Sequence, residues 1–425
     1  MPRGSISEFM VHFDVDRIPG VLSREFEVAR VIARSQGRGP IVAFRVEGCL
    51  QDSVSNIVDT RLKLYKAIDV SSDYEAYSKL FEAMSKQSMI SIVGAPKLSI
   101  AERGLLSLPA VRFYEKEAGL YFSSAVFIAC FDGVCNASIH RVLVRDENTG
   151  VVRIVPRHLW ELYLRARSRG ANLPVTVLIG VHPAILISAA SSPRFGVFEL
   201  EVASSLLGGL EAYESPIHKN PVPYGAAAVI EGWLTGEMLE EGPYVDVIGT
   251  YDRVRLQPVL RVESVYVNKD EYTHVILSGG LESSLLIGFP REVAIWESVS
   301  RVVPKVYKVR LTPASGGWLH AVISIDKRHE GDGKNAILAA FAAHPSLKHV
   351  VVVNSDIDPD DLGQVEWAIA TRFQADKDLI IIRNVRGSTL DPSSKDGLTA
   401  KMGLDATKPI NAGLEFERGR IPGLE

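Results

Sequence analysis

The sequence predicts a mixed α/β protein of the α+β kind, built from three parts. Predicted helices and strands alternate over residues 1–110 and again over residues 301–425. Residues 111–300 are instead rich in strands, which helices only interrupt. An antiparallel barrel or curled sheet with inserted helices fits this middle part better than a doubly wound sheet. At 425 residues the chain is also too long for one small core, so several domains are expected.

The first part is predicted to be a small N-terminal α/β module. Residues 24–36 predict an amphipathic helix, because apolar side chains recur on one face. Residues 41–46 predict a short buried strand, and two polar helices follow at about 60–67 and 73–84. Residues 96–109, with a looser pattern, are the candidate linker to the middle part.

The other two parts differ in the order of their elements. The middle part predicts strands over residues 120–131, 137–144, 175–180, 226–231, 259–267 and 274–277, and helices over 159–169, 184–190 and 199–207. The last part predicts strands over 306–311, 319–325, 349–353 and 379–382, and helices over 335–343 and 360–371. Because strand and helix alternate there, it is expected to be a separate α/β unit with crossover connections.

Composition and missing motifs exclude several classes of protein. A hydrophobic content of 46% with 23% charged residues is ordinary for globular proteins, and a net charge of −4 gives no reason to expect a nucleic-acid partner. No apolar run approaches ~20 residues and the N-terminus has no apolar signal core, so we expect a cytoplasmic protein without a membrane span. Neither GxSxG nor HExxH occurs, which leaves acyl-transfer hydrolysis and zinc proteolysis without support.

Two further features are interpreted as structural. The three cysteines are too few for a disulfide framework, so Cys130 and Cys135 are expected to be small buried apolar residues rather than part of a zinc ribbon. The acidic run at residues 356–361 has Trp367 where a calcium loop needs a bidentate glutamate. We therefore interpret that run as a strand end followed by a helix cap.

A polar segment, Asn136-Ala137-Ser138-Ile139-His140-Arg141, interrupts the apolar strands of the middle part. Such side chains are costly inside a sheet unless something polar lies against them. Strict alternation along a strand would place Asn136 and Arg141 on opposite faces. For both side chains to serve one site, the strand must bulge or end between them, and we predict such a break.

Two candidate sets of functional residues include or follow this segment. Asn136, His158 and Glu199 offer an amide oxygen, an imidazole and a carboxylate, which suit Mn²⁺ or Mg²⁺. Glu241 and Asp246 flank a Gly-Pro turn, and paired carboxylates in a partly dry site can divide the roles of acid and base. The residues alone leave alternatives open: a structural histidine, a wet helix face at Glu199, and a solvated surface turn at residues 240–246.

Taken in order, these motifs resemble the UbiD family of decarboxylases, which use prenylated FMN. The resemblance covers nearly the whole chain, from Ser7-Glu8-Phe9 to the segment Lys401-Met402-Gly403-Leu404-Asp405-Ala406-Thr407-Lys408-Pro409. It implies a split-barrel flavin-binding domain over residues 111–300. It also implies that residues 301–425 form an α/β domain that mediates oligomerisation and contributes Lys401 to the cofactor site.

The resemblance also implies a role for each matched position. Arg141, Glu241 and Asp246 match the catalytic network, with Asp246 as the acid that protonates the carbon from which carbon dioxide leaves. Asn136, His158 and Glu199 match the ligands of a Mn²⁺ or Mg²⁺ ion, beside which K⁺ binds main-chain carbonyls near residues 137 and 190–192. The positions implied to contact prenylated FMN are Asn136, Ser138, Ile139, His140, Arg141, Arg157, His158, Glu199 and Lys401.

Length and overall pattern resemble the archaeal branch of this family, which implies a place in a modified mevalonate pathway. The implied reaction converts trans-anhydromevalonate 5-phosphate to isopentenyl phosphate. A flavin prenyltransferase would supply the cofactor, and the protein would be a homo-oligomer. An aromatic or polyprenyl-hydroxybenzoate acid is the alternative substrate. An accessory subunit of a larger carboxylase complex is the alternative function, and the retention of Arg141, Glu241 and Asp246 argues against it.

Overall fold

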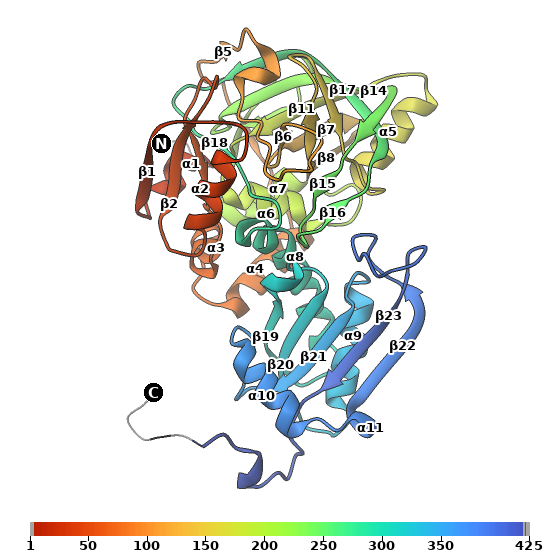
Figure 1. Ribbon diagram of the computed structural model, residues 1–425. Coiled ribbons are helices and arrows are strands. Elements are labelled where there is room, and N and C mark those ends of the chain that lie inside the picture. Colours follow the sequence, from red (N-terminus) through yellow and green to blue (C-terminus); the bar gives the residue numbers. More distant parts are fainter. Residues whose placement is uncertain (1–3, 420, 422–425) are drawn as a thin grey trace. The chain divides into compact units, whose positions relative to one another are not determined.

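The computed structural model describes residues 4–419 and residue 421, which form two compact units (Figure 1). The division lies between Pro290 and Arg291, inside helix α8 (Leu281–Ser300). No element was predicted here, because a proline and a glycine within a helix weaken its sequence pattern. The predicted division into domains 1–110, 111–300 and 301–425 stays a prediction.

The first unit contains a small sheet with strands in the order β1-β2-β3-β18. Its last strand comes from far along the chain, so the N-terminal module is completed by residues after the large sheet. The elements of this region are α1 (Ile6–Met10), β1 (Val15–Leu22), α2 (Glu27–Ser35), β2 (Ile41–Val46), β3 (Ser53–Ser55), α3 (Arg61–Ala67), α4 (Asp73–Ser85) and β18 (Thr273–His274).

The large sheet of the first unit has nine strands and only antiparallel neighbours, in the order β6-β9-β10-β17-β14-β11-β7-β8, with β5 paired to β17. This agrees with the expected antiparallel sheet. Its strands are β5 (Ser99–Ile100), β6 (Tyr121–Phe122), β7 (Val126–Phe131), β8 (Val134–Ile139), β9 (Val142–Val144), β10 (Thr149–Val152), β11 (Leu173–Ile179), β14 (Ala228–Glu241) and β17 (Arg255–Val267).

Three helices are inserted between strands of the large sheet, as predicted: α5 (His158–Ser168), α6 (Pro183–Ser191) and α7 (Glu199–Leu207) (Figure 1). Apolar side chains from the sheet and from α5, among them Phe127, Leu162 and Val177, form a continuous core. Short strands complete the unit: β4 (Ser91–Ile92), β12 (Glu211–Glu214), β13 (Pro221–Pro223), β15 (Tyr244–Val245) and β16 (Tyr251–Asp252).

The second unit is a five-stranded sheet in the order β19-β20-β21-β23-β22, in which β20, β21 and β23 run parallel. The predicted alternation is therefore present. Strand β23 was missed because its burial is inverted: Lys401, Gly403 and Asp405 are buried, whereas Ala400 and Met402 are exposed. The elements are β19 (Lys305–Leu311), β20 (His320–Asp326), α9 (Asp332–Ala343), β21 (His349–Asn354), α10 (Leu362–Arg372), α11 (Ala375–Asp378), β22 (Leu379–Arg386) and β23 (Leu398–Asp405).

The acidic run before α10 is a helix cap, as interpreted from the sequence. The Asp361 side chain accepts hydrogen bonds from the backbone N–H groups of Gly363 and Gln364. The Asp360 carboxylate pairs with Lys308 and Arg310. These carboxylates are thus satisfied by amides and cations of the protein.

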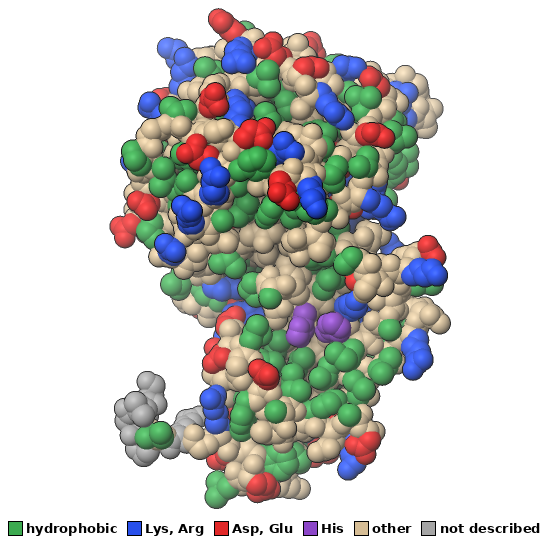
Figure 2. All heavy atoms as spheres, in the orientation of Figure 1, with side chains coloured by type: hydrophobic (Ala, Val, Ile, Leu, Met, Phe, Trp, Pro, Cys, Tyr) green, Lys and Arg blue, Asp and Glu red, His purple; other side chains and the backbone are tan. Residues whose placement is uncertain are grey.

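The distribution of charged side chains and the character of the helices both bear on the expectations drawn from composition. On the face of the first unit shown in Figure 2, acidic and basic side chains are interspersed rather than gathered by sign. Among the described residues, no helix is long and apolar enough to cross a membrane.

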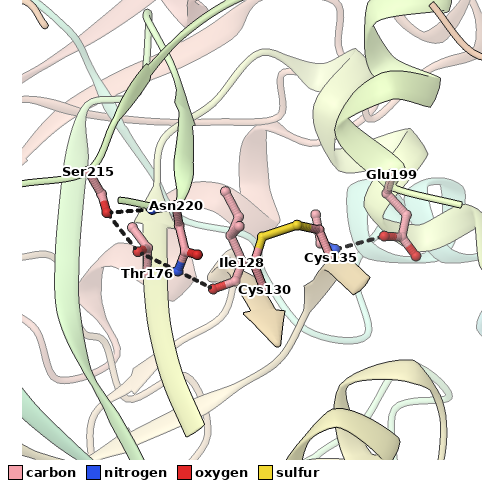
Figure 3. The surroundings of a disulfide bond; sticks show 8 residues. Ile128, Cys130, Cys135, Thr176, Glu199, Ser215 and Asn220 are labelled. Atoms are coloured by element: carbon pink, nitrogen blue, oxygen red, sulfur yellow. Dashed lines mark hydrogen bonds between the residues drawn. A yellow bond between two sulfur atoms is a disulfide. The ribbon is translucent and has the colours of Figure 1, made fainter. Parts of the chain in front are cut away.

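The cysteines require a correction, because Cys130 and Cys135 form a disulfide (Figure 3). Strands β7 and β8 are joined by the two-residue turn Asp132-Gly133, both with positive φ, which is a favoured hairpin geometry. In this register Cys130 lies directly opposite Cys135, with Cα atoms 4.1 Å apart. Phe131 and Val134 flank the turn, and the next pair outward is a non-hydrogen-bonded pair, where facing side chains approach closely. Strand register, rather than cysteine count, decides this bond.

Replacing both hairpin cysteines, as Cys130→Ala with Cys135→Ala, should lower the free energy of unfolding by about 2 kcal/mol, since the closed loop is very short. Denaturant unfolding with and without a dithiol reductant measures this. Reductant should destabilise the parent protein and a Cys49→Ala control, but should leave the double variant unchanged. Three alkylatable thiols in the denatured, unreduced protein would contradict the disulfide.

Candidate active site

The polar segment 136–141 lies where two strands of the large sheet meet. Strand β8 ends at Ile139 and β9 begins at Val142, so His140 and Arg141 form the link between them. The predicted strand end is confirmed. Because the backbone breaks its alternation here, Asn136 reaches Glu199 of α7, whereas Arg141 reaches residues at the ends of β14, β15 and β16.

Arg141 binds both predicted catalytic carboxylates. Its Nε and Nη2 donate to the two oxygens of Glu241, each at 2.8 Å, and its Nη1 donates to Oδ2 of Asp246 at 2.8 Å. A two-point contact of this kind fixes the carboxylate plane as well as its position. Glu241 is fully buried while the Asp246 side chain is 24% exposed, so the solvated-turn alternative is wrong for Glu241.

A third carboxylate, Asp252, belongs to the same cluster and was missed from the sequence. Its Oδ2 accepts from Nη2 of Arg141 at 3.1 Å, and its Oδ1 lies 2.5 Å from Nη1 of Arg255. Burial alone would raise the pKa of Asp252, but these two guanidinium groups hold it below its usual value. Strands β15 and β16 pair Tyr244 with Asp252, and this register brings the side chain to Arg141. A short polar hairpin gives little sequence signal of its own.

Aromatic and backbone contacts hold this cluster in place. The guanidinium of Arg141 lies over the ring of Tyr244, 4.5 Å from its centroid. Glu117 is buried, and its carboxylate accepts backbone N–H groups from Phe113, Tyr114 and Val245, the last of these directly before Asp246. Glu117 thus holds the backbone next to Asp246, while Arg141 holds the Asp246 carboxylate.

The three predicted metal ligands lie together at a second cluster. Glu199, the first residue of α7, is buried, so it does not belong to a wet helix face. Its Oε2 accepts from the backbone N–H of Ala137 at 2.7 Å, which leaves Oε1 for the other two residues. Nδ2 of Asn136 lies 2.9 Å from Oε1, and Nδ1 of His158, the first residue of α5, lies 3.5 Å from it.

The chemistry of this second cluster fits a divalent ion. Carboxylate, imidazole and amide are ligands that Mn²⁺ and Mg²⁺ accept. Within residues 4–419 and 421, no three His, Cys, Asp or Glu side chains converge on a metal position by themselves. The candidate site thus depends on the amide of Asn136, whose oxygen an ion would take as its ligand.

The other predicted cofactor residues lie at different distances from this cluster. Ser138 contacts Asn136, Arg157 donates to Ser192 at the end of α6, and Ile139 is half-buried at the end of β8. Lys401 lies on β23 of the second unit, where its Nζ donates to the carbonyl oxygen of Pro345 at 2.7 Å. Its predicted part in the cofactor site stays a prediction.

His140 should make the protein sensitive to acid. Burial, together with the nearby charges of Arg153 and Arg157, lowers the pKa of His140 to about 4. In the unfolded chain the His140 imidazole takes up a proton near pH 6.5. The free energy of unfolding therefore keeps its full His140 contribution above that pH and falls by roughly 3 kcal/mol as the pH drops to 4. Denaturant unfolding between pH 7 and 4 should show a smaller loss for His140→Gln, and an unchanged loss for the exposed control His329→Gln. Equal losses in all three proteins would contradict this assignment.

Sequence comparison matches most of the chain to one family. Residues 95–281 match the Rift-related domain, and residues 284–406 the C-terminal domain, of 3-octaprenyl-4-hydroxybenzoate carboxy-lyase, UbiD. The chain is 59% identical to the anhydromevalonate phosphate decarboxylase of Aeropyrum pernix, over 100% of this chain and 98% of that protein.

Solved structures give the same match. The UbiD-class enzyme HmfF from Pelotomaculum thermopropionicum, in complex with FMN, is 37% identical with a TM-score of 0.94, covering 98% of this chain and 97% of that chain. An evolved dimeric form of HmfF, in complex with prenylated FMN, is 35% identical with a TM-score of 0.90, covering 99% and 97%. Both alignments include both units of the chain.

Proposed function

The chain belongs to the UbiD family of carboxy-lyases, and we propose that it decarboxylates trans-anhydromevalonate 5-phosphate to isopentenyl phosphate with prenylated FMN. The substrate follows from the relative that is 59% identical over its whole length. The observation that carries the reaction type is the contact of Arg141 with Glu241 and Asp246, a charged network with one partly exposed acid.

The second cluster would hold the cofactor through a divalent ion. Asn136, His158 and Glu199 would bind Mn²⁺ or Mg²⁺, and Ser138 and Arg157 would lie toward the flavin phosphate. K⁺ would bind carbonyl oxygens near residues 137 and 190–192. When bound, prenylated FMN would supply the electron sink for breaking the carbon–carbon bond. The homo-oligomeric state also belongs to this proposal, and sedimentation equilibrium tests it.

The catalytic residues would manage the proton. The substrate carboxylate leaves as carbon dioxide, and the carbon it leaves takes a proton from the carboxyl group of Asp246. Asp246 then regains a proton from solvent, which its partial exposure permits. Glu241 is buried and held at both oxygens, so it keeps Arg141 in position rather than exchanging protons with solvent. Asp252 adds negative charge at Nη2 of Arg141, the nitrogen that also donates to Glu241.

The test is to co-express the protein with a flavin prenyltransferase and to assay carbon dioxide release. A prenylated-flavin absorption spectrum and conversion of anhydromevalonate phosphate to isopentenyl phosphate are expected. Conversion of an aromatic acrylate but not of anhydromevalonate phosphate would overturn the substrate assignment and favour an aromatic acid as substrate. Failure to take up the cofactor would overturn the enzyme proposal itself.

A further inference from the structure

Three hydrogen-bond contacts connect a buried histidine to the candidate metal site, and a fourth holds the other nitrogen of its ring. Nδ1 of His140 lies 3.0 Å from the carbonyl oxygen of Arg153, and its Nε2 lies 2.9 Å from Oγ of Ser138. Oγ of Ser138 is 2.9 Å from Oδ1 of Asn136, and Nδ2 of Asn136 is 2.9 Å from Oε1 of Glu199. The direction of each bond depends on where the protons are.

The surroundings of His140 determine the first direction. The side chain is buried, its ring packs edge-on against Phe127, and the guanidinium groups of Arg153 and Arg157 disfavour a further positive charge. The imidazole is therefore neutral and carries one N–H. Because a carbonyl oxygen can only accept, that N–H is at Nδ1, and Nε2 must accept a hydrogen bond.

The remaining directions follow from the single proton of the serine hydroxyl. If Ser138 donates to Nε2 of His140, its oxygen can only accept from Asn136. The amide of Asn136 must then present Nδ2 to Ser138 and its oxygen to Glu199. The other orientation, in which Ser138 donates to Oδ1, requires a proton on both nitrogens of His140 for the same contacts.

The orientation set by a neutral His140 creates a site for a cation. The oxygen of Asn136 and Oε1 of Glu199 would face each other, with His158 beside them, and two acceptor oxygens repel unless a cation lies between them. We propose that His140 is a positioning residue which, through Ser138, turns the amide oxygen of Asn136 toward Glu199 and prepares the divalent-metal site. The inference rests on the proposed function, because the metal belongs to that proposal.

Metal affinity tests this relay without any assay of activity. Flavin-free protein is titrated with Mn²⁺ by calorimetry, comparing the parent with His140→Phe, Ser138→Ala and the double variant. Partners behind a metal ligand typically change affinity 10- to 100-fold, so each single variant should weaken Mn²⁺ binding by about that factor. Since both variants break one relay, the double variant should bind no more weakly than the weaker single variant. His320→Phe, the same substitution in the second unit, should bind as the parent does.

Three results would overturn the relay. These are parent-like affinity in His140→Phe or in Ser138→Ala, losses that multiply in the double variant, and a parent protein that binds no Mn²⁺. Imidazole ¹⁵N NMR of the Mg²⁺ complex gives a second readout, in which Nδ1 of His140 should carry the proton and Nε2 should be an acceptor. A protein that binds Mn²⁺ through this relay yet leaves anhydromevalonate phosphate unchanged would overturn the proposed function alone.

Discussion

Asp246→Asn should leave metal and flavin bound and lower kcat by at least ~10²-fold, the usual scale for removing a general acid. The asparagine oxygen can still accept the hydrogen bond from Nη1 of Arg141, so the cluster should keep its shape. The amide cannot deliver a proton to carbon. Rates with the prenylated cofactor, together with flavin and metal content, measure the effect.

Asp246 is expected to be the only acid in this step, because its side chain is partly exposed whereas Glu241 and Asp252 are buried. Asp252 and Glu241 continue to balance the charge of Arg141 while Asp246 is protonated, so the acid form does not leave a buried guanidinium unpaired. Glu237→Gln, an exposed carboxylate on β14 paired with Arg261, is the matched control and should keep full activity. Turnover in Asp246→Asn close to that of the control would assign the proton to another group.

Local pattern predicted the elements, and failed where local pattern is weak. Hydrophobic periodicity predicted the position of most helices. The change from alternating helices and strands to successive strand patterns predicted the antiparallel sheet of the first unit. Helix α8 was missed because Pro290 interrupts it, and β23 because its buried face carries Lys401, Gly403 and Asp405 instead of apolar side chains. Such elements are stabilised by packing that a single segment does not reveal.

The site shows the same limit at the level of contacts. The strand end between Asn136 and Arg141 followed from side-chain parity, because a regular strand would place these two residues on opposite faces. The disulfide and the place of Asp252 depend on hairpin register, which short turns fix but sequence spacing does not display. The direction of the Ser138 hydrogen bond depends on a buried imidazole, a property only the folded chain possesses.

His158→Ala should lose the divalent ion and the flavin together, in contrast to Asp246→Asn. The imidazole lies beside Oε1 of Glu199, and removing a direct ligand should weaken metal binding by at least ~10²-fold, the upper end of what outer partners contribute. Without the ion, the flavin phosphate would meet the buried Glu199 carboxylate with no cation between them, and two negative charges at such a site repel.

Metal analysis and flavin absorbance after desalting measure both losses in the same sample. His329→Ala, an exposed histidine of the second unit, is the control and should retain both groups. If His158→Ala kept its flavin and lost only turnover, it would behave as Asp246→Asn does. The division into a metal cluster around Glu199 and a proton-transfer cluster around Arg141 would then be wrong, because the two substitutions separate these functions only if each cluster performs one of them.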